Sequence, residues 1–230
     1  MVFLTFDDGP VPEVTPRVLD LLDELGVKAT FFMVGDNVRR HPELLEEVRR
    51  RGHGVGNHTM HHLQGMRTRG VSYLRDVAEA DALIGSRLFR PPHGEYNSNI
   101  ASLSRSEGME VVMWSATYHD STGKYTEKQI MKLATTGNDY TPGTIVLCHV
   151  NGYYQPNSLD AGLTHYESLG LQVVPISALI YASGRELPAM PEGEEALVYT
   201  NEYWENWLAN NLPEYAPQPA EEATAEAAAE

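Results

Sequence analysis

The chain has 230 residues, 42% of them hydrophobic, which is enough for one domain with a substantial core and a short appendage. Its formal net charge of −15 is concentrated at the C-terminus, because residues 186–230 contain 11 acidic residues and neither Lys nor Arg. Neither part offers the basic face of a nucleic-acid-binding protein, and no apolar run is long enough to span a membrane. The single cysteine, Cys148, excludes an internal disulfide, and we expect it to be buried because it lies in an apolar run.

Apolar runs alternate with helix-like stretches along the chain, and the first run ends at Asp7 and Asp8. Strands are expected near residues 1–6, 27–34, 55, 88–90, 110–114, 144–148 and 171–174. Helices are expected between them, at about 15–25, 42–52, 72–84 and 99–107, after 126, and at about 159–169. Residues with capping chemistry begin three of these helices: Thr15, Ser72, and Thr126 with Gln129 in a capping box.

Repeated strand–helix alternation predicts a parallel sheet with helices on its outside. The seven expected strands favour a barrel, and an open doubly wound sheet is the alternative. Polar side chains lie at or just beyond the C-terminal ends of these strands: Asp7, Asp8, His58, Arg90, Asp120 and His149. Both folds collect their active sites at that edge, so we expect these residues to lie together.

The predicted barrel is expected to end near residue 184. An extension at 185–215 has aromatic and apolar residues spaced like one face of a helix: Tyr199, Tyr203, Trp204, Trp207, Leu208 and Leu212. We expect this helix to pack on the barrel, with a sugar-stacking platform as the alternative, and its acidic flanks argue against membrane docking. Residues 216–230 are rich in Ala, Glu and Pro and are expected to be disordered.

Two stretches carry side chains suited to metal chemistry. Asp7 and Asp8 end the first strand, and neighbouring strand residues point to opposite faces, so one can hold a metal while the other acts as a base. The alternative interpretation is an acidic turn before Gly9-Pro10. His58 and His62 are four residues apart and share one face of a helical turn. One carboxylate and two imidazoles are a typical ligand set for a catalytic zinc that keeps an open position.

The run from Thr5 to Pro10, followed by this histidine pair, resembles the polysaccharide deacetylase family, also called the NodB-homology or carbohydrate esterase 4 family. The resemblance continues through Arg90-Pro91-Pro92-His93-Gly94 and Leu147-Cys148-His149, and it covers roughly residues 2–182. It implies a distorted seven-stranded (β/α) barrel. It also implies hydrolytic removal of an acetyl group from an N-acetylated sugar, sometimes from an O-acetylated one.

The resemblance implies that Asp8, His58 and His62 hold a divalent metal. Zinc suits this set best, and cobalt and nickel are alternatives. His61 is a competing ligand, and only the four-residue spacing and the family motif favour His62 over it.

The resemblance also assigns catalytic roles. Asp7 would act as the general base, held in place by Arg90, and His149 as the acid that protonates the leaving amine. Asp120 would orient His149. Three further residues would contact the substrate and its oxyanion. They are His93, through its backbone N–H, together with Pro92 and Leu147.

The chain departs from the family pattern at three positions. His93 stands where the family usually has Tyr, which leaves the backbone donor unchanged. In place of an Asp-x-x-Asp-Trp pattern the chain keeps Asp120 but has Thr117 and Ser121, so an aromatic wall of the groove is lost and substrate preference is affected.

His53 and His119 are expected to be structural or surface residues.

The predicted function is therefore metal-dependent N-deacetylation of peptidoglycan, a chitin-type oligosaccharide or a related N-acetylhexosamine polymer. The alternatives are an O-acetyl ester hydrolase acting on acetylated xylan and a catalytically weak carbohydrate-binding barrel. We expect the protein to be a monomer whose partner is the acetylated glycan. We expect neither nucleic-acid binding nor membrane insertion. Family members usually carry a segment before the first strand, so an export signal that precedes this sequence is expected, with a cytoplasmic location as the alternative.

Overall fold

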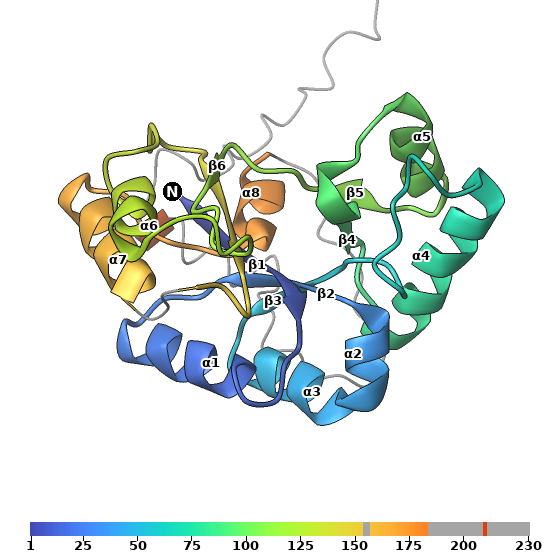
Figure 1. Cartoon of the computed structure of the whole chain (residues 1–230), viewed down its shortest axis with the longest axis horizontal. Helices are drawn as coiled ribbons and strands as arrows, with labels where there is room; N and C mark the ends of the chain where they lie inside the picture. Colours follow the sequence, from blue (N-terminus) through green and yellow to red (C-terminus); the bar gives the residue numbers. More distant parts are fainter. Residues whose placement is uncertain (154–156, 184–208, 211–230) are drawn as a thin grey trace, which may run out of the picture.

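The computed structural model describes residues 1–153, 157–183 and 209–210 (Figure 1). The expected extension at 185–215, apart from residues 209–210, and the acidic tail at 216–230 lie outside the described residues. The strands are β1 (Phe3–Gly9), β2 (Thr30–Met33), β3 (Gly54–Asn57), β4 (Leu88–Phe89), β5 (Glu110–Val111), β6 (Ala116–Thr117) and β7 (Ile145–His149). The helices are α1 (Thr15–Glu24), α2 (Gly35–Arg40), α3 (Pro42–Arg50), α4 (Gly70–Ile84), the 3-10 helix η1 (Pro92–Gly94), α5 (Ser98–Ser106), α6 (Glu127–Ala134), α7 (Asn157–Ser168) and α8 (Ile176–Ala182).

The strands form one parallel sheet in the order β5-β4-β3-β2-β1-β7-β6. If the two ends of this order are placed next to each other on a circle, the strands follow one another in chain order, and β5 and β6 are the neighbours that do not pair. This is the arrangement of a singly wound barrel that does not close. A doubly wound sheet would reverse its order at an internal strand, so that alternative is excluded. Six of the helices lie outside the strands, with α1 and α3 on one side, α4 and α5 on a second, and α6 and α7 on a third (Figure 1). The prediction of a distorted seven-stranded (β/α) barrel is confirmed.

The Arg90 side chain binds the backbone where the chain leaves β5, at the break between β5 and β6. The sequence predicts one strand at 110–114, but β5 covers only the first two of these residues and β6 begins beyond the gap. The carbonyls of Val112 and Met113 accept hydrogen bonds from Arg90, through Nε at 3.0 Å and Nη2 at 3.2 Å. The guanidinium thereby satisfies backbone carbonyls that a continuous strand would offer to a neighbour.

The prediction of a strand at 171–174 is wrong. Val173 forms only an isolated parallel bridge with Val2. The Val2 N–H donates to the Gln172 carbonyl at 2.8 Å, and the Val174 N–H donates to the Val2 carbonyl at 3.0 Å. Leu171 and Val174 are buried where the segment passes the start of β1 on its way to α8, so its apolar character reflects packing and not a strand of the sheet.

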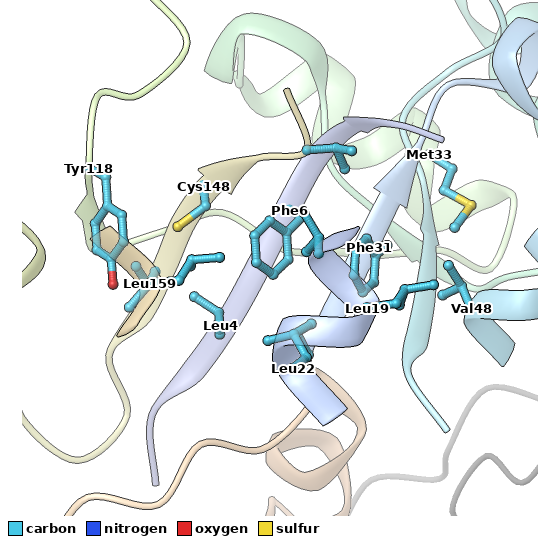
Figure 2. Packing of buried hydrophobic residues seen from close by; sticks show 14 of the residues in the cluster. Leu4, Phe6, Leu19, Leu22, Phe31, Met33, Val48, Tyr118, Cys148 and Leu159 are labelled. Carbon is cyan, nitrogen blue, oxygen red and sulfur yellow. The ribbon is translucent and has the colours of Figure 1, made fainter. Parts of the chain in front are cut away.

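Alternation along β1 divides the core between the outside and the inside of the barrel. On the outside, Phe6 stacks on Phe31 of β2 with ring centroids 5.0 Å apart, next to Leu19 and Leu22 of α1 (Figure 2). Burying each such side chain contributes roughly 1.5–3 kcal/mol. Phe3 faces the interior, where it clusters with residues of α8, and Thr5 and Asp7 follow it at the two-residue period of a strand. The same alternation that builds the core therefore delivers a carboxylate to the inner rim.

Two of the three predicted helix caps differ from the structure. Thr126 caps α6 in a capping box with Gln129, as predicted. Thr15 is the first residue of α1 and does not cap it, because its hydroxyl accepts the Val11 N–H at 2.8 Å. Ser72 lies inside α4, which begins two residues earlier. Short helix α2 has no counterpart among the predicted elements.

Cys148 on β7 is fully buried, as predicted. Burial raises the pKa of its thiol well above the usual value, so the thiol stays protonated and packs as a small apolar group. Across the described ranges, no helix combines the length and apolar character needed to cross a bilayer.

Candidate metal and catalytic site

Strand register brings the polar strand ends together at one edge of the barrel. Asp7 lies directly across from His149 in the β1–β7 pair. Asp120 follows β6, which is the other neighbour of β7. The last residue of β3 pairs with the last residue of β4, so His58 and Arg90 emerge side by side. The residues expected at strand ends therefore meet.

A bulge at the end of β1 turns both carboxylates to the same side. The register with β2 shifts between Phe6 and Gly9, and Asp8 has φ 71°, a value uncommon outside glycine. Asp7 Oδ2 and Asp8 Oδ1 consequently both approach His58 Nε2, at 3.7 and 3.6 Å. The expectation that the two side chains point to opposite faces is wrong, because the bulge redirects one of them.

Asp8, His58 and His62 form a group whose ligand atoms all lie within 4.8 Å of one another. Asp8 Oδ1 is 3.2 Å from His62 Nε2. His58 Nδ1 donates to the Arg90 carbonyl at 2.8 Å, so Nε2 is the ring nitrogen that faces Asp8. Burial raises the pKa of Asp8, but hydrogen bonds from His58 and His62, with the positive charge of His58 and His149, outweigh burial and hold the pKa well below its usual range.

His61 lies on the other side of the loop. Its Nδ1 is 2.5 Å from Asp76 Oδ1, and its side chain is 47% exposed. The hydrogen bond to Asp76 raises the pKa of His61 against the opposing effect of burial. The structure therefore brings His62, and not His61, to Asp8.

The Asp7 carboxylate is held inside the barrel by Arg90. Arg90 Nη1 donates to Asp7 Oδ1 at 2.8 Å and to Thr5 Oγ1 at 2.7 Å, and the Thr5 hydroxyl donates to the Val146 carbonyl at 2.6 Å. Arg90 is fully buried, with its guanidinium 4.1 Å from the Phe32 ring centroid. Burial lowers the pKa of Arg90, and the charge of Asp7 opposes that effect. Charge-assisted bonds of this kind hold a carboxylate in one orientation.

His149 is held at two points by the fully buried Asp120. The carboxylate accepts the His149 backbone N–H at 2.9 Å and pairs with ring Nδ1 at 2.8 Å. Burial lowers the pKa of His149, but the hydrogen bond and charge of Asp120, with the charges of Asp7 and Asp8, outweigh burial and raise it. The imidazole is therefore oriented and keeps its proton to a higher pH than an ordinary histidine.

These groups line a hollow of about 350 Å³. Its remaining lining residues are His93, Trp114, Thr117, His119, Ser121 and Leu147. His93 has φ 61°, and its ring packs edge-on to His62 with centroids 4.5 Å apart. Burial, and then the charge of His62, lower the pKa of His93. Pro92, buried at the start of η1, fixes the backbone that leads into this wall.

Known proteins resemble this chain over most of its length. The sequence model described as "Polysaccharide deacetylase" matches residues 1–112. A peptidoglycan-N-acetylglucosamine deacetylase from Bacillus cereus is 31% identical over 189 residues, which cover 78% of this chain and 88% of that protein. A chitooligosaccharide deacetylase from Bradyrhizobium sp. is 33% identical over 201 residues, covering 83% and 89%. The chain belongs to the polysaccharide deacetylase family.

Solved structures agree with this assignment. Peptidoglycan deacetylase PdaC from Bacillus subtilis matches with a TM-score of 0.69 at 29% identity, covering 78% of this chain and 89% of that structure. The curled parallel sheet with its outer helices is thus the fold of the polysaccharide deacetylases.

The sequence did not single out Thr5 and His119 as residues of this site. Thr5 bonds to Arg90, and it lies two residues before Asp7 on a strand, so the two-residue period was a usable signal. His119 was expected to be structural or at the surface. It is exposed, lines the hollow, and stacks on Tyr125 with ring centroids 5.1 Å apart. Nothing in the local pattern distinguished His119 from the other histidines.

Proposed function

We propose that this member of the polysaccharide deacetylase family removes acetyl groups from the amide nitrogen of an N-acetylated glycan by metal-dependent hydrolysis. The observation that carries the proposal is the convergence of three units on one hollow: the Asp8–His58–His62 group, the Asp7–Arg90 pair and the His149–Asp120 pair. Peptidoglycan and chitin-type oligosaccharides are the first substrates to test, since the two similar proteins are named for these glycans.

The Asp8–His58–His62 group fits a divalent metal. An ionised carboxylate with two imidazoles is a common set for zinc, and it also suits cobalt and nickel. The His58 Nδ1–H bond to a carbonyl supports the fit, because such an outer partner directs the Nε2 lone pair to the metal. When bound, zinc supplies Lewis acidity toward the acetyl carbonyl and lowers the pKa of water.

Asp7 is suited to take a proton from the attacking water. Its Oδ1 is engaged by Arg90, while its Oδ2 faces the His58 side of the hollow. General base catalysis of this kind is worth roughly 10²–10⁴-fold in rate. The backbone N–H of His93 is the expected donor to the oxyanion that develops on the acetyl oxygen, a contact whose loss costs about 10²–10³-fold.

His149 is suited to give a proton to the departing nitrogen. Water oxygen forms the new bond to the acetyl carbon, the carbon–nitrogen bond breaks, and the amine leaves with the proton from His149. Asp120 holds Nδ1, so Nε2 is the ring atom that delivers this proton. The products are acetate and a free amino sugar.

The test uses the full chain with zinc on three substrates: an N-acetylated chitooligosaccharide, peptidoglycan fragments and O-acetylated xylan. Mass spectrometry should show acetyl loss from an N-acetylated glycan, abolished by exhaustive chelation and restored by zinc. Acetyl loss from xylan alone would make the chain an O-acetyl ester hydrolase. Glycan binding without any acetyl loss, with zinc bound, would make it a carbohydrate-binding barrel.

A further inference from the structure

A buried carboxylate from α4 lies against the loop that carries His58 and His62. Asp76 is 5% exposed, and its Oδ2 accepts two consecutive backbone N–H groups, from Met60 at 2.9 Å and from His61 at 3.2 Å. Its Oδ1 is 2.5 Å from His61 Nδ1. One side chain thus binds three groups in the middle of the loop and holds the His61 ring away from Asp8.

The loop needs such support because its backbone is strained. Thr59 has φ 63° and His62 has φ 55°, both in the left-handed region, and for a β-branched residue such as Thr59 this is a clear outlier. Such conformations persist only where surrounding contacts determine them. The first two N–H groups of α2 supply part of this support, donating to the carbonyls of Thr59 and Met60 at 2.9 Å each. Asp76 is the side chain that fixes the opposite edge of the same peptides.

The contact has a counterpart within the same site. Asp120 binds a backbone N–H and the ring Nδ1 of His149. Asp76 binds the backbone N–H and the ring Nδ1 of His61, and adds the Met60 N–H. In both cases a buried aspartate locks the direction of one histidine together with its backbone. Because His61 and His62 are adjacent, locking His61 toward α4 directs His62 toward Asp8.

We propose that Asp76 is a positioning residue for metal binding: by holding the Met60 and His61 backbone and the His61 ring, it keeps His62 and not His61 at the metal site before the metal arrives. This inference rests on the proposed metal-dependent function. In this proposal Asp76 acts through the hydrogen bonds that its side chain accepts from the backbone. A neutral side chain with an acceptor oxygen in the same place should therefore preserve zinc binding.

The first arm of the test measures zinc affinity of the full chain by competition with a chelator. Asp76→Ala should weaken zinc binding about 10–100-fold, the usual effect of removing an outer partner of a metal ligand. Asp76→Asn keeps an oxygen that can accept both N–H groups and should stay close to the unsubstituted chain. Asp81→Ala, on the same helix and with its own bond to the Ser86 N–H at 3.2 Å, is the matched control and should leave the affinity unchanged.

The second arm needs no metal. In the zinc-free chain, amide hydrogen exchange at Met60 and His61 should be slow, and Asp76→Ala should accelerate it there without accelerating exchange throughout the core. If Asp76→Ala does not fold, the test rests on Asp76→Asn, which should keep these amides protected and the zinc affinity close to that of the unsubstituted chain. Fast exchange at Met60 and His61 in Asp76→Asn would then overturn the proposal.

Unchanged zinc affinity and exchange in Asp76→Ala would overturn the proposal. Equal weakening by Asp76→Asn and Asp76→Ala would also overturn it, because charge and not backbone contact would then be responsible. If the unsubstituted chain binds no zinc, the proposed metal-dependent function fails. The exchange arm still decides whether Asp76 orders the loop.

Discussion

Asp7 and Asp8 are neighbours with different partners. Asp7 bonds to buried Arg90, and Asp8 faces the two histidines. Asp7→Asn should therefore keep zinc bound and lower kcat by roughly 10²–10⁴-fold, because it removes the base. Asp8→Asn should instead weaken zinc binding. Chelator competition and kcat on one N-acetylated oligosaccharide separate the two effects, and an exchange of the two phenotypes would reverse the assigned roles.

His149 should matter most where the leaving group needs a proton. An amine departs poorly without protonation, whereas an activated phenolate departs readily. His149→Ala should therefore reduce kcat/KM for an N-acetylated sugar by about 10²–10⁴-fold and reduce hydrolysis of an activated phenyl acetate much less. Parallel assays on the two substrates check this, and equal losses on both would remove His149 from the acid role.

Asp120 should set the alkaline limit of activity. It raises the pKa of His149, and an acid works only while it is protonated. Asp120→Asn removes the negative charge, so His149 loses its proton at a lower pH and the alkaline limb of the kcat/KM profile should move to lower pH. Profiles of the two proteins on the same oligosaccharide measure the shift. An unmoved alkaline limb would mean that another group titrates there.

At the scale of elements, Arg90 joins β4 to β1 and to the gap between β5 and β6. Arg90→Met would leave Asp7 as an unpaired buried charge and should lower the free energy of unfolding by about 3–5 kcal/mol. Adding Asp7→Asn should recover part of that loss, because the unpaired charge is then absent. Urea unfolding measures both variants. Arg105→Met, at an exposed position on α5, is the control and should change stability by less than about 0.5 kcal/mol.

A larger loss in the double variant than in Arg90→Met alone would contradict this account. It would mean that Asp7 contributes to the barrel through contacts other than the ion pair.

At the scale of the whole molecule, His53 should make stability depend on pH. Its ring is fully buried, with Nδ1 accepting the Ala29 N–H at 3.2 Å, and burial lowers its pKa from 6.5 to about 4. Between these values the unfolded chain binds the proton and the folded chain does not, so the free energy of unfolding falls as pH falls. The complete loss, below pH 4, is roughly 3 kcal/mol.

The measurement is urea unfolding at pH 7 and pH 5 for the unsubstituted chain and for His53→Asn, whose side-chain oxygen can replace Nδ1 as acceptor. His53→Asn should show a smaller difference between the two pH values, whatever its absolute stability. His119→Asn, at an exposed histidine, should leave the difference unchanged. An equal pH dependence in all three proteins would remove His53 as its source.

What the sequence by itself determined is local in origin. The apolar periods placed the helices and most strands, and the ends of those strands placed Asp7, Asp8, His58, Arg90, Asp120 and His149 at one edge. Side-chain spacing favoured His62 over His61. These results follow from the two-residue and 3.6-residue periods and from turn chemistry, which act between near neighbours.

Only the tertiary structure decided how those residues face one another. The bulge at Asp8, the break bridged by Arg90, and the clamp of Asp76 on His61 each depend on partners distant in sequence: Arg90 reaches Thr5 across 85 positions and Asp76 reaches His61 across 15. A strained backbone angle or a redirected side chain is stable only where such contacts outweigh its local cost, and no local pattern contains them. For that reason the motifs predicted which residues form the site, but they did not predict the geometry that lets two adjacent carboxylates share it.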